Sequence, residues 1–92
     1  MKEAHIMIKG FVQGVGYRKW ARKEAQKAGI TGWIRNLPDG SVEALLQGDK
    51  DTIEKLLNLY KKGPFLSEVE DIDTIWEAQK ETFPDFSIRH DF

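Results

Sequence analysis

Apolar and polar residues repeat with two different periods along this chain. The apolar side chains Ala4, Ile6 and Ile8 occupy every second position, which predicts a strand with one buried face. From Tyr17 onward the spacing changes to three and four residues, which predicts a helix that ends at Gly29. The predicted buried stripe of this helix consists of Tyr17, Ala21, Ala25 and Ala28.

The same two periods recur in the middle of the chain. Strands are predicted over residues 30–36 and 41–47, with a turn at Pro38-Asp39-Gly40 between them. A second helix is predicted to begin at a Gly48-Asp49 cap and to end within residues 61–64. Its apolar positions follow the i, i+3, i+4, i+7 rule and are Ile53, Leu56, Leu57 and Tyr60.

Two further strands complete the pattern. Residues 67–76 are rich in Val, Ile and Trp but alternate imperfectly, which predicts a strand with a bulge, and residues 86–90 predict a short final strand. The order strand, helix, strand, strand, helix, strand predicts an α+β, ferredoxin-like split βαβ sandwich (βαββαβ). In it, both helices cover one face of a four- or five-stranded antiparallel sheet. The length and the absence of a linker predict a single domain over residues 1–92. This fold hosts enzymes, metabolite sensors and RNA-binding domains, so it does not name a function.

Composition excludes several kinds of site and of location. The 92 residues include no cysteine, so the chain holds no disulfide, thiolate metal site or cysteine nucleophile. No apolar run approaches the roughly 20 residues that span a bilayer. The charged start Met1-Lys2-Glu3 leads into a strand pattern rather than a signal peptide, and we expect a cytoplasmic protein with no membrane partner.

Charge is divided unevenly along the chain. Residues 1–36 hold eight Lys and Arg against two acids, whereas residues 37–92 hold six against thirteen, and the net charge is −1. Together with a pI near 6.1, this division favours a local anion site over a general nucleic-acid-binding surface. Two solvated helix faces of unequal sign would explain the same division.

Glycines concentrate between the first predicted strand and the first helix, at positions 10, 14 and 16. A loop that enters a helix presents unpaired N–H groups and the positive end of the helix dipole, and glycines let it fold closely around an anion. The spacing matches neither a dinucleotide fingerprint nor a P-loop. Gly14 and Gly16 are predicted to serve such a cradle, whereas the end of a strand would account for Gly10 equally well.

Cations stand where the helix dipole disfavours them. The predicted first helix has no acid before Glu24, and each exposed cation at this end costs about 0.3–1 kcal/mol at low salt. A bound phosphate would reverse the sign of that cost. Arg18 directly follows the glycine loop, and its planar guanidinium suits two phosphate oxygens at once, so it is predicted to bind the anion. The other cations are predicted to be solvated surface charges, namely Lys19, Arg22 and Lys23.

Three segments carry a resemblance to a known family. The runs 10–18 (GFVQGVGYR), 32–36 (GWIRN) and 38–43 (PDGSVE) are similar to the signature of acylphosphatases, and the likeness extends over nearly the whole chain. Two positions depart from the family pattern, because Tyr17 stands where Phe is common and Phe11 where a polar residue is frequent.

The resemblance implies metal-independent hydrolysis of acyl phosphates to a carboxylate and inorganic phosphate. It implies that Arg18 holds the phosphate and that Asn36 positions the attacking water. It also implies a backbone phosphate-binding loop of Gly14, Val15, Gly16, Tyr17 and Arg18. Without the resemblance, Asn36 before the turn at residues 38–40 would be predicted to start that turn by bonding its own backbone.

The remaining polar residues suggest no other chemistry. The family likeness implies no cofactor, and we expect a monomer with no metal and no nucleic-acid partner. We also expect that inorganic phosphate or sulfate can occupy its site. His5 and His90 lie far apart, and the acids of residues 68–73 are predicted to keep an edge strand soluble. The three tryptophans are predicted to pack in or near the core; they are Trp20, Trp33 and Trp76. An RNA-recognition domain would need aromatic residues on the strand 41–47, which has none. A dimeric metabolite-sensing domain is an alternative that a turnover assay separates.

Overall fold

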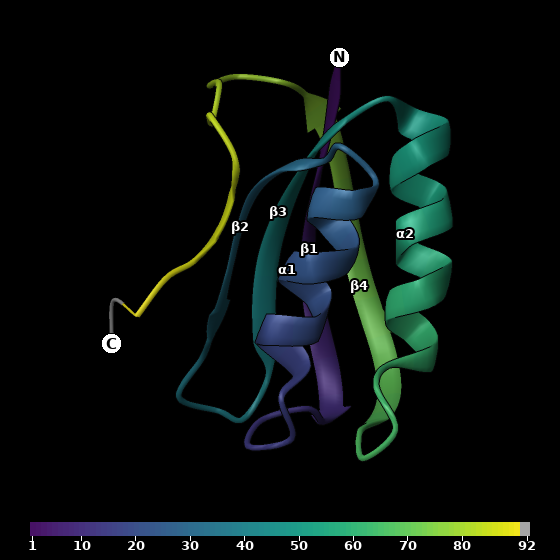
Figure 1. Cartoon of the computed structure of the whole chain (residues 1–92), viewed down its shortest axis with the longest axis vertical. Helices are drawn as coiled ribbons and strands as arrows, with labels where there is room; N and C mark the ends of the chain where they lie inside the picture. The colour runs from purple at the N-terminus through teal and green to yellow at the C-terminus, as the bar shows by residue number, and fades with distance from the viewer. Residues whose placement is uncertain (91–92) are drawn as a thin grey trace.

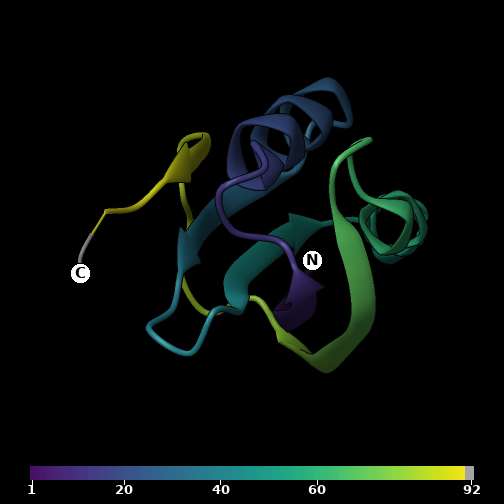
Figure 2. The ribbon, with the colours of Figure 1, turned by 90° about the horizontal axis from the view of Figure 1, so that it is seen from below.

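The computed structural model describes residues 1–90, which form a five-stranded sheet with two helices on one side of it (Figures 1 and 2). In chain order the elements are β1 (Lys2–Phe11), α1 (Tyr17–Lys27), β2 (Thr31–Asn36), β3 (Val42–Gly48), α2 (Lys50–Lys62), β4 (Glu68–Ala78) and β5 (Phe86–Ile88). The strand order in the sheet is β4-β1-β3-β2-β5. The predicted ferredoxin-like arrangement is therefore confirmed, with β3 between the parallel strands β1 and β2.

The bulge predicted in the fourth strand is confirmed. Opposite β1 the register jumps from Lys9↔Asp71 to Gly10↔Val69, which leaves Glu70 as an extra residue of β4. The predicted edge position of this strand is also confirmed, because β4 pairs only with β1 among the described strands. Its acids therefore line an open sheet edge, where charge opposes pairing with another chain.

The prediction of a wholly antiparallel sheet is wrong at one edge. Strand β5 pairs with β2 in parallel, in the register Gly32↔Phe86 to Ile34↔Ile88. The reason lies in the connection: β4 runs opposite to β1, so a single reversal after Ala78 points the chain in the direction of β1 and β2. The segment that follows crosses the end of the sheet to its other edge, as Figure 1 shows in yellow-green.

The core lies between the sheet and the helices. The predicted apolar faces of β1 and β3 are fully buried, and the predicted stripe of α2 is buried with them. Two tyrosines fix the helices to each other, because the hydroxyl of Tyr17 donates to the carbonyl of Tyr60 at 2.7 Å and the hydroxyl of Tyr60 donates to the carbonyl of Ala21 at 2.6 Å. Both hydroxyls are thus satisfied inside the core.

One predicted core position is wrong. Ala28 is exposed, because α1 ends before it and Ala28 is the C-cap. The amides of Gly29 and Ile30 donate to the carbonyls of Gln26 and Ala25, which is the hydrogen-bond pattern of a Schellman motif. The predicted stop at Gly29 is therefore confirmed, and it moves Ala28 out of the buried stripe.

Candidate active site

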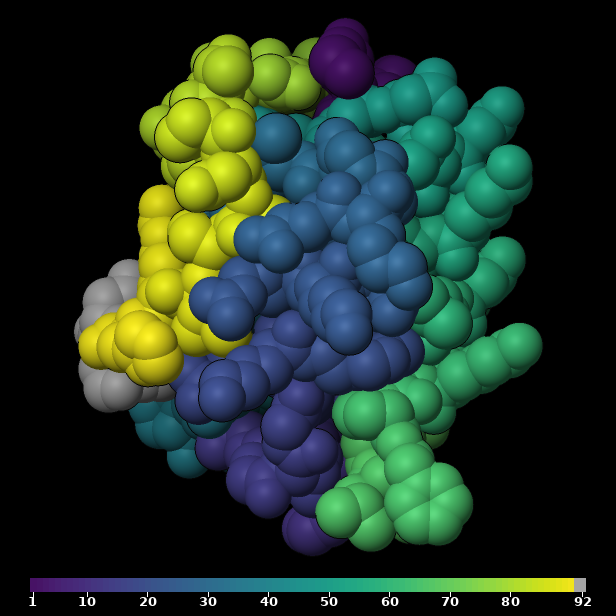
Figure 3. Space-filling view, in the orientation of Figure 1, coloured from purple at the N-terminus to yellow at the C-terminus, as the bar shows by residue number. Residues whose placement is uncertain are grey.

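The sheet topology brings two loops to the same end of the sheet. Strands β1 and β2 run in the same direction, so the loop after β1 (residues 12–16) and the turn after β2 (residues 37–41) leave the sheet at the same end. Figure 1 shows both at its lower end, and in Figure 3 the purple loop forms the lower part of the surface below α1. Residues that lie far apart in the sequence can therefore act on one ligand.

The start of α1 leaves its backbone donors available. Gly16 is the N-cap in a left-handed conformation (φ 77°), Gly14 also has a positive φ (75°), and no side chain caps the helix. Within residues 1–90, the backbone N–H groups of residues 14–18 donate none of the hydrogen bonds. Unpaired amides at a helix N-terminus constitute an anion-binding feature.

Both glycines are needed for conformation rather than for packing. An added Cβ at Gly14 or Gly16 would meet no atom within 4 Å, so only the positive φ opposes a side chain there. Gly10 differs, because a Cβ there would lie 2.2 Å from the carbonyl oxygen of Glu68 across the bulge. The strand-end explanation of Gly10 is wrong, because β1 continues to Phe11. Gly10 instead allows β4 to approach β1 closely.

Tyr17 fixes the first turn of α1 from inside the protein. Its side chain is only 1% exposed and hydrogen-bonded to α2, and burial raises the pKa of its hydroxyl. A residue of the predicted phosphate-binding loop can thus contribute its backbone N–H to the surface while its ring anchors the helix in the core.

Arg18 is the one cation among residues 14–18. Its side chain is partly buried, and it forms no ion pair or hydrogen bond with any residue of the described chain. Since the first turn of α1 contains no acid, its charge is uncompensated. Of the predicted surface cations, Lys19 and Lys23 are exposed, whereas Arg22 is partly buried.

Asn36 ends β2 with an unsatisfied acceptor. Its side-chain oxygen Oδ1 is buried and has no hydrogen-bond partner among residues 1–90. The turn after it is closed without this side chain: Leu37 N–H donates to Ser41 O, Gly40 N–H donates to Leu37 O, and Asp39 accepts from Ser41. The alternative in which Asn36 starts the turn is therefore wrong, and its amide is available to a ligand or a water molecule.

Gln13 is a functional candidate that residue-by-residue sequence reasoning missed. Its Nε2 donates to Leu37 O and to Ser41 O, each at 2.8 Å, so this side chain joins the glycine loop to the turn beside Asn36. Its partners are backbone carbonyls 24 and 28 positions away, and no spacing rule identifies such partners. The only sequence signal is its place inside the run 10–18.

His5 belongs to a hydrogen-bonded group of side chains on the face of the sheet away from the helices. Its Nε2 lies 2.6 Å from Glu43 Oε2, and Arg35 Nε donates to Glu43 Oε1 at 2.6 Å. Burial opposes ionisation of Glu43, but the hydrogen bonds from His5 and Arg35 outweigh it and hold the pKa of this carboxyl below its ordinary value. No group of three or more potential metal ligands lies close together in the described residues.

The tryptophans pack as predicted, partly buried rather than open to stacking by a ligand. Trp20 lies against Tyr17 and Tyr60, and Trp33 lies under the guanidinium of Arg89, whose Cζ is 4.5 Å from the ring centre. The third, Trp76, packs against the core.

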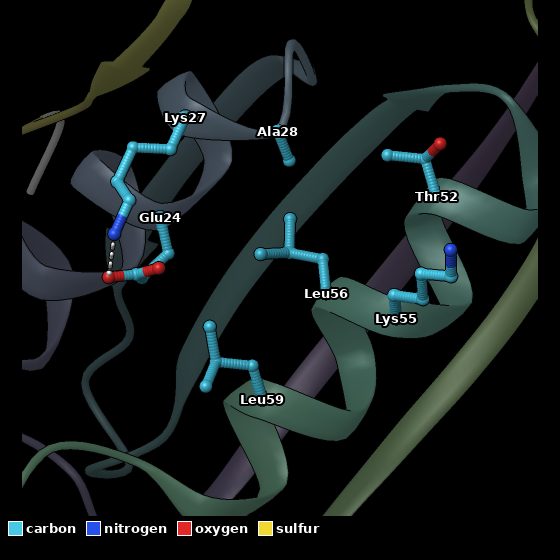
Figure 4. Close-up of a pocket in the computed structure, with 7 residues that line it drawn as sticks. All are labelled: Glu24, Lys27, Ala28, Thr52, Lys55, Leu56 and Leu59. Atoms are coloured by element: carbon cyan, nitrogen blue, oxygen red, sulfur yellow. Dashed lines mark hydrogen bonds and ion pairs between the residues drawn. The ribbon is translucent and has the colours of Figure 1, made fainter.

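A groove of about 280 Å³ lies away from these residues (Figure 4). It lies between the last turns of α1 and helix α2, and its apolar lining residues are Ala28, Leu56 and Leu59. The groove is at the opposite end of α1 from Arg18 and contains no unpaired buried polar atom. It therefore takes no part in the candidate site.

Neither helix in residues 1–90 is long and apolar enough to cross a membrane.

Comparison with known proteins identifies the family. The model of the acylphosphatase family matches residues 4–88, which is nearly the full length of the chain. The chain belongs to the acylphosphatase family. An acylphosphatase of Alcanivorax borkumensis is 50% identical over 72 residues (78% of each chain), and one of Methylococcus capsulatus is 41% identical over 91 residues (99% of each chain). The crystal structure of the acylphosphatase from Bacillus subtilis superposes with a TM-score of 0.95 at 34% identity, covering 98% of this chain and 100% of that one.

Proposed function

We propose that this chain hydrolyses acyl phosphates to a carboxylate and inorganic phosphate, at a site formed by the loop 14–18, Arg18 and Asn36. Family membership supports the reaction class. The observation that carries the site is that three sets of polar groups, none of which has a partner within residues 1–90, lie at the same end of the sheet. They are the loop amides, the Arg18 guanidinium and the Asn36 oxygen.

The loop and Arg18 bind the phosphoryl group. Five backbone N–H groups and a guanidinium surround the phosphate oxygens with positive charge, which stabilises the charge that these oxygens carry in the transition state. The acid-free first turn of α1 keeps this environment positive. Every group of the site lies within residues 14–36 of one chain, which supports action as a monomer.

Asn36 orients the attacking water. A carboxamide can accept a hydrogen bond from one water molecule and donate one to it without titrating near neutral pH, and the buried oxygen Oδ1 of Asn36 can accept the hydrogen bond from this water. The water oxygen forms a bond to phosphorus while the bond from phosphorus to the acyl oxygen breaks, and that electron pair leaves on the carboxylate. A phosphate oxygen of the substrate takes the proton of the water. Because a carboxylate is a good leaving group, the site needs no acidic side chain to protonate it.

A substrate comparison tests this function. Purified protein in excess EDTA is expected to release phosphate from acetyl phosphate and to hydrolyse phenyl phosphate at least about 100-fold more slowly. Phenolate is a much more basic leaving group than acetate, and the proposed site contains no general acid to supply the roughly 100-fold assistance that phenolate would need. Absence of phosphate release, or equal rates on both compounds, would refute the proposal.

Phosphate binding gives a second, independent measurement. In an NMR titration with inorganic phosphate, the amide signals of residues 14–18 are expected to shift. The amide signals at the start of α2, residues 50–52, serve as the matched control and are expected to stay in place.

A further inference from the structure

We propose that Gln13 is a positioning residue that sets the separation between the phosphate-binding loop and Asn36. The inference rests on the proposed function above. It assigns to Gln13 neither contact with the substrate nor a role in proton transfer.

The hydrogen bonds of Gln13 use its donor capacity completely. The side-chain Nε2 carries two N–H bonds, and it has two acceptors at 2.8 Å, Leu37 O and Ser41 O. Both distances are within the ordinary range for amide–carbonyl hydrogen bonds. The side chain is partly buried, so water cannot replace these bonds freely.

The two acceptors are the ends of the turn that follows Asn36. Leu37 O also accepts from Gly40 N–H at 3.2 Å, and Ser41 O also accepts from Leu37 N–H at 2.9 Å. The amide of Gln13 therefore binds to the closed base of this turn rather than to one flexible point on it. On the other side, Gln13 directly precedes Gly14, the first residue of the phosphate-binding loop.

No other side chain in the described structure hydrogen-bonds the glycine loop to the turn. The hydrogen bonds of residues 12–16 and of residues 37–41 contain only the two Gln13 bonds in common. The loop positions the phosphorus atom and Asn36 positions the water. The two hydrogen bonds of Gln13 therefore determine how the water approaches the phosphorus atom. A misplacement of about 1 Å can cost on the order of 100-fold in rate.

Kinetics of Gln13→Met test the proposal. This variant keeps the length of the side chain and removes both donors. We expect kcat on acetyl phosphate to fall about 10- to 100-fold, with KM and the inhibition constant for inorganic phosphate within about threefold of wild type. The matched control is Gln26→Met, because the Gln26 amide also donates to a backbone carbonyl, that of Phe86 at 3.3 Å, outside the site. Its kcat is expected to equal that of the wild type.

A double-mutant cycle distinguishes a role of Gln13 in positioning the water from a general structural role. Asn36→Ala is expected to lower kcat strongly in the wild-type background and by less than about threefold in the Gln13→Met background, because the water is already misaligned there. Full additivity of the two effects would overturn the proposal. So would a folded Gln13→Met variant with wild-type kcat.

Gln13→Glu adds a test by pH. The carboxylate has no donor and faces two carbonyl oxygens, but its protonated form offers one O–H. We therefore expect the ratio of kcat in Gln13→Glu to kcat in wild type to rise as pH falls through the pKa of the new carboxyl. A flat ratio would contradict the proposal, as would loss of the folded near-UV circular dichroism signal in both Gln13 variants. An inactive wild type would instead refute the proposed function.

Discussion

Helix α2 begins at Asp49, whose side chain accepts a hydrogen bond from Thr52 N–H, and it has Asp51 in its first turn. The N-cap of helix α1 is Gly16, and within residues 1–90 no side chain caps this helix and no acid lies in its first turn. A cap contributes about 1 kcal/mol and a favourable charge about 0.3–1 kcal/mol. The start of α1 thus gives up stability that the start of α2 keeps. The difference teaches that the start of α1 lacks the cap and the negative charge that helices favour, at the place where a bound anion can supply both.

Arg18→Ala is expected to have the largest effect on activity. Loss of the guanidinium removes the charged phosphate ligand, so kcat/KM on acetyl phosphate should fall by about 10³-fold, with weaker inhibition by inorganic phosphate. Stability should stay unchanged or rise by about 0.3–1 kcal/mol, because the cation opposes the helix dipole. Steady-state kinetics and urea unfolding measure both. Lys50→Ala, at the start of α2, is the control and should leave kcat/KM at the wild-type value.

Asn36→Ala is expected to come next. Removing the amide should lower kcat by about 10²-fold through loss of water alignment, while inhibition by inorganic phosphate stays the same. Stability should not fall, because the lost oxygen has no partner among the described residues. The exposed Asn58 on α2 provides the control variant Asn58→Ala. A loss of phosphate binding as large as the loss of kcat would contradict the separate roles assigned to Asn36 and Arg18.

Alanine at the two ends of α1 separates backbone strain from function. Gly16 and Gly29 have nearly equal φ values of 77° and 72°, and an added Cβ at either would meet nothing within 4 Å. Each substitution should lower the free energy of unfolding by about 1–2 kcal/mol. Only Gly16→Ala should also reduce kcat/KM, about tenfold, because it displaces the loop amides. Equal kinetics for the two variants would remove Gly16 from the site.

Asp49→Ala is expected to have a small effect, and only on stability. The bond from Thr52 N–H is long, 3.4 Å, so the loss should be about 0.5–1 kcal/mol in urea unfolding, with wild-type kcat. Asp51→Ala serves as the comparison, since it removes a first-turn charge without removing the cap, and it should cost less. A change in kcat in either variant would weaken the contrast between the two helix starts.

The sequence allowed the helices and most strands to be predicted because their signals are local. In α2, for example, the cap, the apolar spacing and the closing Gly63 lie within 15 residues, and all three are present in the structure. The parallel pairing of β5 with β2 could not be predicted in this way. It depends on which edge of the sheet the chain reaches after β4, and no property of residues 86–88 encodes that edge.

The candidate site likewise contains residues with a local sequence signal and residues whose role depends on the fold. Arg18 could be predicted because a cation in an acid-free first turn is a local anomaly. For Asn36, the residues alone favoured a turn, and only the family likeness suggested a role in the site. The role proposed for Gln13 depends on carbonyl groups that folding brings from the other side of β3, so no local sequence signal indicates it.

The hydrogen bond from Tyr17 to the Tyr60 carbonyl has a consequence for the catalytic cycle. Because the helix end next to Arg18 is tethered to the hydrophobic interior, its order does not depend on an occupant. Under the proposed function, departure of orthophosphate would leave a binding loop already shaped for the next substrate molecule, with no refolding step between one turnover and the next.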